Sequence, residues 1–381
     1  MFRLSLIGLL PVLTLAAQLN SASPRIEIAM KKIIADHDVP GAVTLIANKK
    51  GIVHLQAIGA SGPGTAPPIE TDSIFWIASM TKPITGTAIL MLQDEGKLNV
   101  NDLVSKFIPE LGNLKTPSGQ SANLTLKHLM THSSGMPEAS EAEARTALKL
   151  ADLIPFYLNK PMQFEPGAKW QYCQSGINTL GRIIEIASGQ PYDIFLAKRL
   201  FQPLGMKDTT FYIRPDQLSR VVTPVSREKD GSFLATRVGV LFDKPATSTD
   251  RYPAANGGLY STAPDYARFA RMILNGGKLD GKRYLKSASV RLMTTIQSGE
   301  LKTGFTPGNG WGLTWCVVRE PQGVTAMLSP GTHGHGGAHG TQAWIDPKKG
   351  TVLILMVQRS NFANGDDSAV RLAFQQAALA H

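Results

Sequence analysis

The chain has very little cysteine and no long run of charge of one sign. Only two of its 381 residues are cysteines, which excludes a disulfide-built scaffold and a cysteine-rich zinc or iron–sulfur protein. Charged residues make up 18% and hydrophobic residues 43%, a balance that excludes extended disorder, a collagen-like fibre and a coiled coil. The length exceeds the ~100–200 residues usual for one domain, so one large or two closely packed domains are expected.

The formal net charge of +10 is a feature shared with many nucleic-acid-binding proteins. Here, however, lysine and arginine are scattered, in runs no longer than pairs such as Lys31-Lys32 and Lys348-Lys349. The expectation is therefore a generally cationic surface that tolerates anionic envelopes or substrates, with no nucleic acid as partner.

The N-terminus has the pattern of an export signal. A short positive start, Met1-Phe2-Arg3, precedes an apolar run from Leu4 to Ala17, which is too short for a bilayer but suits the core of a signal peptide. The expectation is a signal peptide over 1–22 and a secreted or periplasmic protein, and the alternative is an uncleaved N-terminal helix. No other apolar stretch is long enough for a membrane helix.

Export implies an oxidising compartment, which allows Cys173 and Cys316 to pair. Because the sequence does not show whether their Cα atoms come close, two free thiols remain the favoured interpretation.

The two ends of the chain each predict a β-hairpin, and the middle predicts helices. The β-rich runs are Ala42–Ala47 with Ile52–Ile58 and Gln342–Ile345 with Thr351–Val357; both pairs flank turn residues. We expect an α/β (α+β) fold whose antiparallel sheet is built from both termini and flanked by helices. The predicted division is an α/β domain over 23–75 and 211–381, with a mainly helical domain over 76–210.

A candidate nucleophile stands at the head of a predicted helix. Residues three apart share one face of a helix, so Ser79-Met80-Thr81-Lys82 would place a hydroxyl beside an amine. Pro83 is tolerated only in a first helical turn, which locates Ser79 at the N-terminus of the helix. A serine needs a base within hydrogen-bond reach, and burial would favour the neutral amine of Lys82.

This spacing alone is weak evidence, because it recurs at Ser226-Arg227-Glu228-Lys229. That second copy lies in a charged stretch without an apolar stripe. No Gly-x-Ser-x-Gly segment is present, so a nucleophile elbow of the α/β-hydrolase kind is not supported.

Two further segments complete a pattern with Ser79 and Lys82. They are Tyr172-Cys173-Gln174, before a predicted helix, and His335-Gly336-Gly337-Ala338, before a predicted strand. Together they resemble the three motif boxes of the penicillin-recognising serine hydrolases, within them the class C β-lactamase-like group with its family VIII carboxylesterases and D-alanyl-D-alanine carboxypeptidases. The likeness extends through FWIASMTKPITGTAILML, LTLKHLMTHSSGMP, LGRIIEIASGQPYDIFLAKRLFQPLGMKDT, NGGLYSTAPDYARFARMILNGG and GTHGHGGAHGTQAWIDPKKG.

The resemblance implies an acyl-enzyme mechanism without a metal or other cofactor. Ser79 would attack the substrate carbonyl, and Lys82 with Tyr172 would move its proton. The backbone N–H groups of Ser79 and of Ala338, on the strand edge, would form the oxyanion hole. A tyrosine near amine or imidazole groups is expected to have a lowered pKa, which would allow Tyr172 to act as a base.

Two departures from the lactamase pattern bear on the substrate. Gln174 stands where β-lactamases have asparagine in Tyr-x-Asn. His335-Gly336-Gly337 stands where they have Lys-Thr-Gly, so an imidazole replaces a permanent ammonium that would hold a substrate carboxylate. Such a third box is common in the esterases of this superfamily, and the expected activity is hydrolysis of small or medium acyl esters. A β-lactamase or a D-alanyl-D-alanine carboxypeptidase is the alternative, and the oligomeric state stays open.

The remaining histidines and aromatic residues have competing interpretations. His333, His335 and His339 suggest a metal site, but their glycine neighbours favour a loop with close backbone approach. His128 and His132 are spaced i, i+4 on a predicted helix, where a structural role is favoured. A reference pKa of ~6.5 predicts that His335 becomes charged below that pH and then favours acidic substrates. Some aromatic residues are expected in the acyl pocket or the core: Trp76, Tyr252, Tyr260, Trp311 and Trp315.

Overall fold

The computed structural model describes residues 15–380, with side chains from Ser23 onward. The expected signal peptide at 1–22 therefore lies outside the residues whose side chains are described. Helix α1 (Leu15–Ala35) begins within that expected segment, and its apolar stripe of Ile26, Met30 and Ile33 is buried. No helix among residues 15–380 is both long enough and apolar enough to cross a membrane.

The centre of the fold is an antiparallel seven-stranded sheet in the order β2-β1-β13-β12-β11-β10-β9. The N-terminal hairpin β1–β2 joins the C-terminal strands through β1 and β13, where Val43 pairs with Met356 and Asn48 with Thr351. This confirms the expected fold class, a sheet assembled from both termini. The strands are β1 (Gly41–Asn48), β2 (Ile52–Gly59), β9 (Asn309–Trp311), β10 (Cys316–Val318), β11 (His333–Gly336), β12 (Gln342–Asp346) and β13 (Thr351–Met356).

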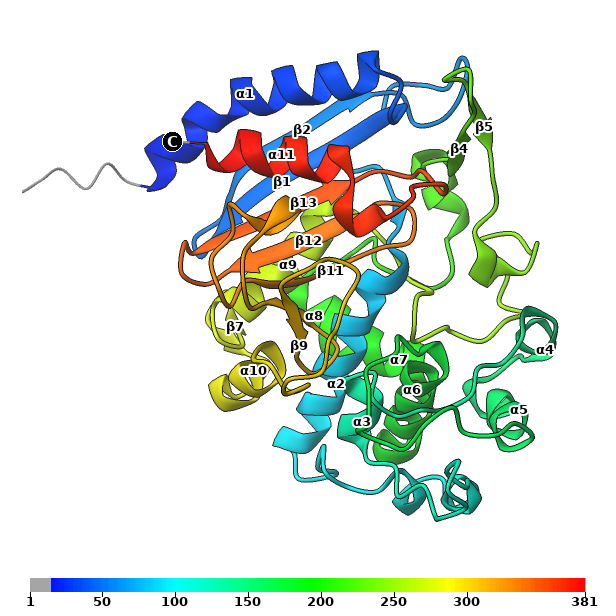
Figure 1. The fold of residues 1–381 in the computed structure, drawn as a ribbon. Helices are drawn as coiled ribbons and strands as arrows, with labels where there is room; N and C mark the ends of the chain where they lie inside the picture. Colours follow the sequence, from blue (N-terminus) through cyan, green and yellow to red (C-terminus); the bar gives the residue numbers. More distant parts are fainter. Residues whose placement is uncertain (1–14, 381) are drawn as a thin grey trace, which may run out of the picture.

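Alternation along the strands gives each face of the sheet its own hydrophobic core. Ile46, Leu353 and Leu355 pack on one face beneath α1 and α11 (Ala369–Leu379), which lie side by side across the sheet (Figure 1). Val43 and Ile354 belong to the opposite face, which α9 (Ala263–Leu274) covers.

The helices of the middle segment gather below the sheet in Figure 1. Helix α2 (Thr81–Asp94) packs against α6 (Gln174–Ser188), and the same hydrophobic cluster continues from these helices to β1. The division into an α/β and a helical domain stays a prediction. The other helices are α3 (Leu126–Met130), α4 (Glu141–Thr146), α5 (Ile154–Leu158), α7 (Tyr192–Leu196), α8 (Gln202–Leu204) and α10 (Ser287–Thr294).

Three short antiparallel pairs of strands lie outside the main sheet. They are β3 (Phe75–Trp76) with β6 (Tyr260–Ser261), β4 (Val225–Arg227) with β5 (Phe233–Ala235), and β7 (Lys278–Leu279) with β8 (Lys282–Arg283). The first pair matters for the site, because β3 leads directly into Ser79.

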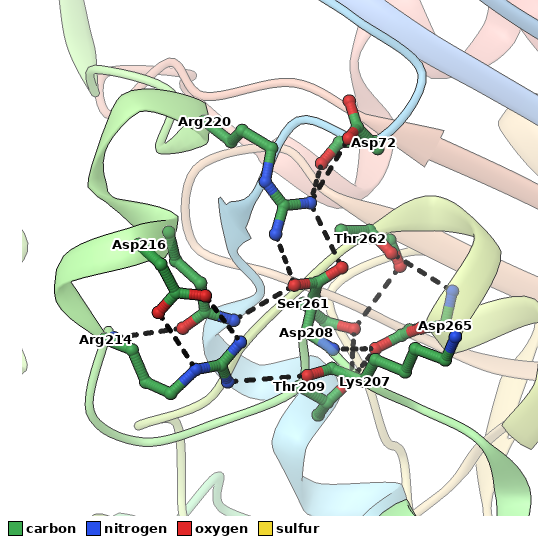
Figure 2. A network of polar contacts seen from close by, with 11 residues as sticks. Asp72, Lys207, Asp208, Thr209, Arg214, Asp216, Arg220, Ser261, Thr262 and Asp265 are labelled. Carbon is green, nitrogen blue, oxygen red and sulfur yellow. Dashed lines mark hydrogen bonds and ion pairs between the residues drawn. The ribbon is translucent and has the colours of Figure 1, made fainter.

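A polar network fixes the approach to β3 (Figure 2). Arg220 donates to carboxylate oxygens of both Asp72 and Asp208, at 3.3 and 3.1 Å. Asp265, in the first turn of α9, accepts from the Asp208 N–H at 2.7 Å and from the Thr209 hydroxyl at 3.0 Å. The turn before β3 is thereby tied to the start of α9.

Candidate active site

Ser79 lies in a tight turn, Ala78–Met80, immediately before α2. The Ile77 N–H donates to the Leu259 carbonyl at 3.0 Å, which extends the β3–β6 pairing up to the turn. Ala78 then adopts a left-handed φ of 45°, a conformation that non-glycine residues keep only when the surroundings enforce it. The expected place of Ser79, at the head of the helix, agrees with this geometry.

Lys82 is fully buried one turn further along. Its ammonium nitrogen, Nζ, donates to Ser79 Oγ at 3.0 Å and to the Asn256 carbonyl at 2.6 Å. Burial lowers the pKa of Lys82 to about 7, although the charges of Glu138 and Cys173 act in the opposite direction. A large share of the lysine is therefore neutral near pH 7 and able to accept the Ser79 proton.

Tyr172 lies beside this pair, and Lys82 Nζ is 4.6 Å from the centre of its ring. Burial raises the pKa of Tyr172 above its usual range, and the contact with Ser79 lowers that pKa by less. The prediction that neighbouring nitrogen groups lower the pKa of Tyr172 is thus wrong, because loss of hydration outweighs them. Near neutral pH the Tyr172 hydroxyl therefore keeps its proton, and Lys82 is the group of the pair whose pKa suits a base.

His335 faces Tyr172 from strand β11. Its Nδ1 is 2.7 Å from the Gly336 carbonyl, so Nδ1 carries the proton and Nε2 accepts from the Tyr172 hydroxyl at 3.4 Å. Only 3% of the His335 surface is exposed, and burial, followed by the Lys82 charge, lowers its pKa to about 3. The expectation that His335 becomes charged just below pH 6.5 is therefore wrong.

Two residues that the sequence interpretation missed hold this group together. The side-chain amide of Asn256 donates from Nδ2 to Gln174 Oε1 at 3.0 Å, while the backbone carbonyl of Asn256 accepts from Lys82. Glu138 accepts from the backbone N–H groups of Gln174 and Ser175, at 2.5 and 2.9 Å. These are the first two residues of α6, whose N–H groups have no partner within the helix. Glu138 thus fixes the helix start next to Tyr172.

The end of β11 approaches the Ser79 turn through glycines. A Cβ on Gly337 would collide with Thr341 Oγ1 and lie 2.7 Å from the Ile77 carbonyl oxygen, and one on Gly336 would collide with Asp366. Strand β10 pairs only with His333 and Gly334, so the edge beyond Gly334 has no strand beside it there. Glycine is required at 337 because the Thr341 side chain and the Ile77 backbone lie too close for a Cβ, and at 336 because the Asp366 side chain does.

Ala338 lies one position beyond this approach, in the turn after β11 and not on the strand as expected. Ala338 is exposed to solvent. Within residues 15–380, neither the Ala338 N–H nor the Ser79 N–H has a backbone acceptor. Both donors are therefore free for a substrate oxygen.

The other histidines occupy different surroundings. His132 lies beyond the end of α3, with φ 57°, so it does not share a helix face with His128 as predicted. Its Nδ1 accepts from the Cys173 N–H at 3.1 Å, and its ring centroid is 4.4 Å from that of Tyr172. His333 and His339 face Trp315 and Trp76, respectively. Among the described residues, no three acidic, histidine or cysteine side chains form a metal-binding group.

Cys173 and Cys316 are free and buried, as favoured from the sequence. Of the aromatic residues expected in the pocket or core, Trp311 lies near Tyr172, with ring centroids 6.0 Å apart. Trp315 stacks on Phe269 within the core. Ser226, in the rejected second copy of the motif, bonds to Glu228 in the β4–β5 pair.

Comparison with known proteins agrees with this arrangement. The family model described as Beta-lactamase matches residues 26–378. The chain belongs to the beta-lactamase family. Penicillin-binding protein 4 of Amycolatopsis lactamdurans is 31% identical, with 84% of this chain and 81% of that protein covered. Esterase EstB of Burkholderia gladioli is 27% identical, with 88% and 90% covered.

The fold also matches solved structures of this family. EstCE1, described as a hydrolase with promiscuous acyltransferase activity, superposes with a TM-score of 0.82 at 21% identity, covering 96% of this chain and 100% of EstCE1. The resemblance drawn from the motif boxes is confirmed, and the protein is a serine hydrolase of the beta-lactamase family.

Proposed function

We propose that the protein is a carboxylesterase that hydrolyses small or medium acyl esters through an acyl-enzyme at Ser79. The observation that carries the proposal is the neutral, buried His335 at the third motif box, with a pKa of about 3. A β-lactam or peptide carboxylate gains from a charge-assisted bond to a fixed cation, worth ~1.5–3 kcal/mol. An ester without a carboxylate has no need of that bond.

Acylation uses the proton positions described above. Neutral Lys82 takes the proton of Ser79, 3.0 Å away, as Oγ bonds to the ester carbonyl carbon. The carbonyl oxygen becomes an oxyanion, which the N–H groups of Ser79 and Ala338 receive. Fixed donors of this kind stabilise charge where it develops, and each is worth ~3–4 kcal/mol.

Collapse of the intermediate breaks the bond to the leaving alcohol. Tyr172 donates its proton to the alcohol oxygen, and the Lys82 ammonium, next to the ring, stabilises the phenolate and returns the proton to it. Water then attacks the acyl carbonyl carbon, and Lys82 with Tyr172 takes one of its protons. The bond between the acyl carbon and Ser79 Oγ breaks, the carboxylic acid leaves, and the same pair returns the proton to Oγ. His335 keeps the Tyr172 hydroxyl in place by accepting from it.

The alternative function is that of a β-lactamase or D-alanyl-D-alanine carboxypeptidase. Its support is that the same serine, lysine and tyrosine serve amide substrates in this family, and that penicillin-binding protein 4 is among the relatives. Parallel measurement of kcat/KM on p-nitrophenyl acetate and butyrate, a chromogenic cephalosporin and a D-Ala-D-Ala peptide separates the two. Faster turnover of the cephalosporin or peptide than of every ester would overturn the esterase proposal.

Export is part of the proposal and rests on the N-terminal sequence pattern. Expression of the full chain in a Gram-negative host, followed by N-terminal sequencing of the protein from the periplasm, tests it. A new N-terminus near residue 23 is expected, and retention of Met1 in a cytoplasmic protein would contradict it.

A further inference from the structure

Phe305 is an exposed aromatic side chain placed against the proposed catalytic tyrosine. It lies in the loop between α10 and β9, and 47% of its surface is exposed. Its ring centroid is 5.0 Å from that of Tyr172 and 5.9 Å from that of Trp170, edge to face in both cases. Its exposed ring therefore borders the reacting groups, where it is open to contact with an apolar part of a substrate.

The loop that carries Phe305 is held in place by a hydrogen bond to its backbone. Asn364 donates from Nδ2 to the Phe305 carbonyl oxygen at 2.8 Å. Phe305 also lines a small cavity together with Trp311, His335 and Gly336. The loop and the end of β11 therefore border the same space, and Phe305 is anchored through its backbone while its ring stays open to solvent.

The chemistry of the site tells which part of a substrate would meet this ring. In the mechanism above, Tyr172 gives its proton to the leaving alcohol oxygen, so the alcohol lies on the Tyr172 side of the scissile bond. Phe305 and Trp170 both contact the Tyr172 ring, so they are aromatic residues next to the group that protonates the alcohol. The acyl chain, attached to Ser79, extends from the opposite side of the carbonyl carbon.

We propose that Phe305, with Trp170, forms a subsite for an apolar alcohol group of the ester. The inference rests on the proposed esterase function and adds the class of leaving group, an aryl or medium-length alkyl alcohol. A ring stacked edge to face on Tyr172 extends the apolar wall without adding charge, and each contact with an apolar group gains from burial.

The test compares two matched ester series on the wild type and on Phe305→Ala. One series varies the alcohol at constant acetate, from methyl to hexyl and phenyl acetate; the other varies the acyl chain at constant ethanol, from acetate to hexanoate. We expect Phe305→Ala to lower kcat/KM for hexyl and phenyl acetate by about tenfold relative to methyl acetate. The acyl series should keep its wild-type ratios, and Phe305→Leu should restore part of the alcohol preference.

Ile28→Ala removes an exposed apolar side chain from α1, 70% exposed, and is the control that should change neither series. If Phe305→Ala loses kcat/KM equally across the alcohol series, Phe305 only supports the fold. If the change is confined to the acyl series, the acyl chain is the group that contacts Phe305. Either result overturns the inference. If the wild type hydrolyses methyl acetate but shows no preference along the alcohol series, the inference fails while the esterase proposal stands. If it hydrolyses no ester at all, the esterase proposal itself fails.

Discussion

The burial of Lys82 should be visible in both the pH dependence of activity and the stability of the fold. Only the neutral amine accepts the Ser79 proton, and its pKa is about 7. kcat/KM should therefore fall tenfold per pH unit well below pH 7 and level off above it. Tyr172, whose pKa burial raises, adds no loss of activity up to about pH 9.

The same shift has a cost in folding free energy. In the unfolded chain Lys82 keeps its proton up to its ordinary pKa of 10.5, whereas in the folded chain burial lowers this pKa to about 7. Between these values the unfolded state binds more protons, so stability rises with pH across this window. At 1.36 kcal/mol per pH unit of difference, the cost below pH 7 is on the order of 5 kcal/mol.

Lys82→Met keeps the buried aliphatic stem but removes the amine. The variant should lose activity by ~10² or more, as removal of a positioned base does, and yet be more stable than the wild type at pH 7. Loss of the hydrogen bond to the Asn256 carbonyl reduces this gain in folding stability by ~1–3 kcal/mol. The difference in stability should shrink as the pH rises from 7 to 10.

Calorimetric Tm and kcat/KM on p-nitrophenyl acetate, both from pH 5 to 10, give the two readouts on the same protein. Lys97→Met, at a side chain 45% exposed, is the control and should match the wild type in both. An apparent pKa below 5 for the acid limb of the kcat/KM profile would contradict the assignment of Lys82 as the base. A Lys82→Met variant that is less stable than the wild type at every pH would contradict the cost of burying this lysine.

Three further predictions concern the neighbours of Ser79. Tyr172→Phe should lower kcat by ~10² or more. Because the pair moves one proton, the double variant with Lys82→Met should lose much less activity than the product of the two single losses. Multiplicative losses in steady-state kinetics would show independent roles. Glu138→Gln removes a charge that raises the pKa of Lys82, so the acid limb of kcat/KM should move to lower pH, and an upward move would contradict this. Gly337→Ala should lower kcat far more than it changes Tm, since the added Cβ displaces β11 from the Ser79 turn; unchanged ester kinetics would count against the close approach.

Features set by local sequence were predictable, because their physical causes lie within a few residues. The hairpins at 41–59 and 342–356, the helix after Ser79 and the Ser79–Lys82 contact follow from hydrophobic alternation, turn residues and helical spacing. A single sheet built from both hairpins was also expected from the sequence, whereas the structure is what identifies β1 and β13 as the strands that join them.

The rest depended on contacts between distant segments. Asn256 reaches Lys82 and Gln174 across more than 80 residues, and no spacing rule relates such positions. The pKa errors for Tyr172 and His335 have one origin: the sequence identifies charged neighbours but not the depth of burial, and burial dominates both shifts. Phe305 carried no motif, so its position beside Tyr172 emerged only from the fold.

Intact-protein mass spectrometry of the acyl-enzyme tests the central claim most directly. The protein is mixed with p-nitrophenyl butyrate and quenched in acid within milliseconds to seconds. We expect a mass increase of about 70 Da, one butyryl group in place of a proton, located by peptide mapping at Ser79 and absent from Ser79→Ala. Butyrylation at another residue, or unchanged ester hydrolysis by Ser79→Ala, would contradict it.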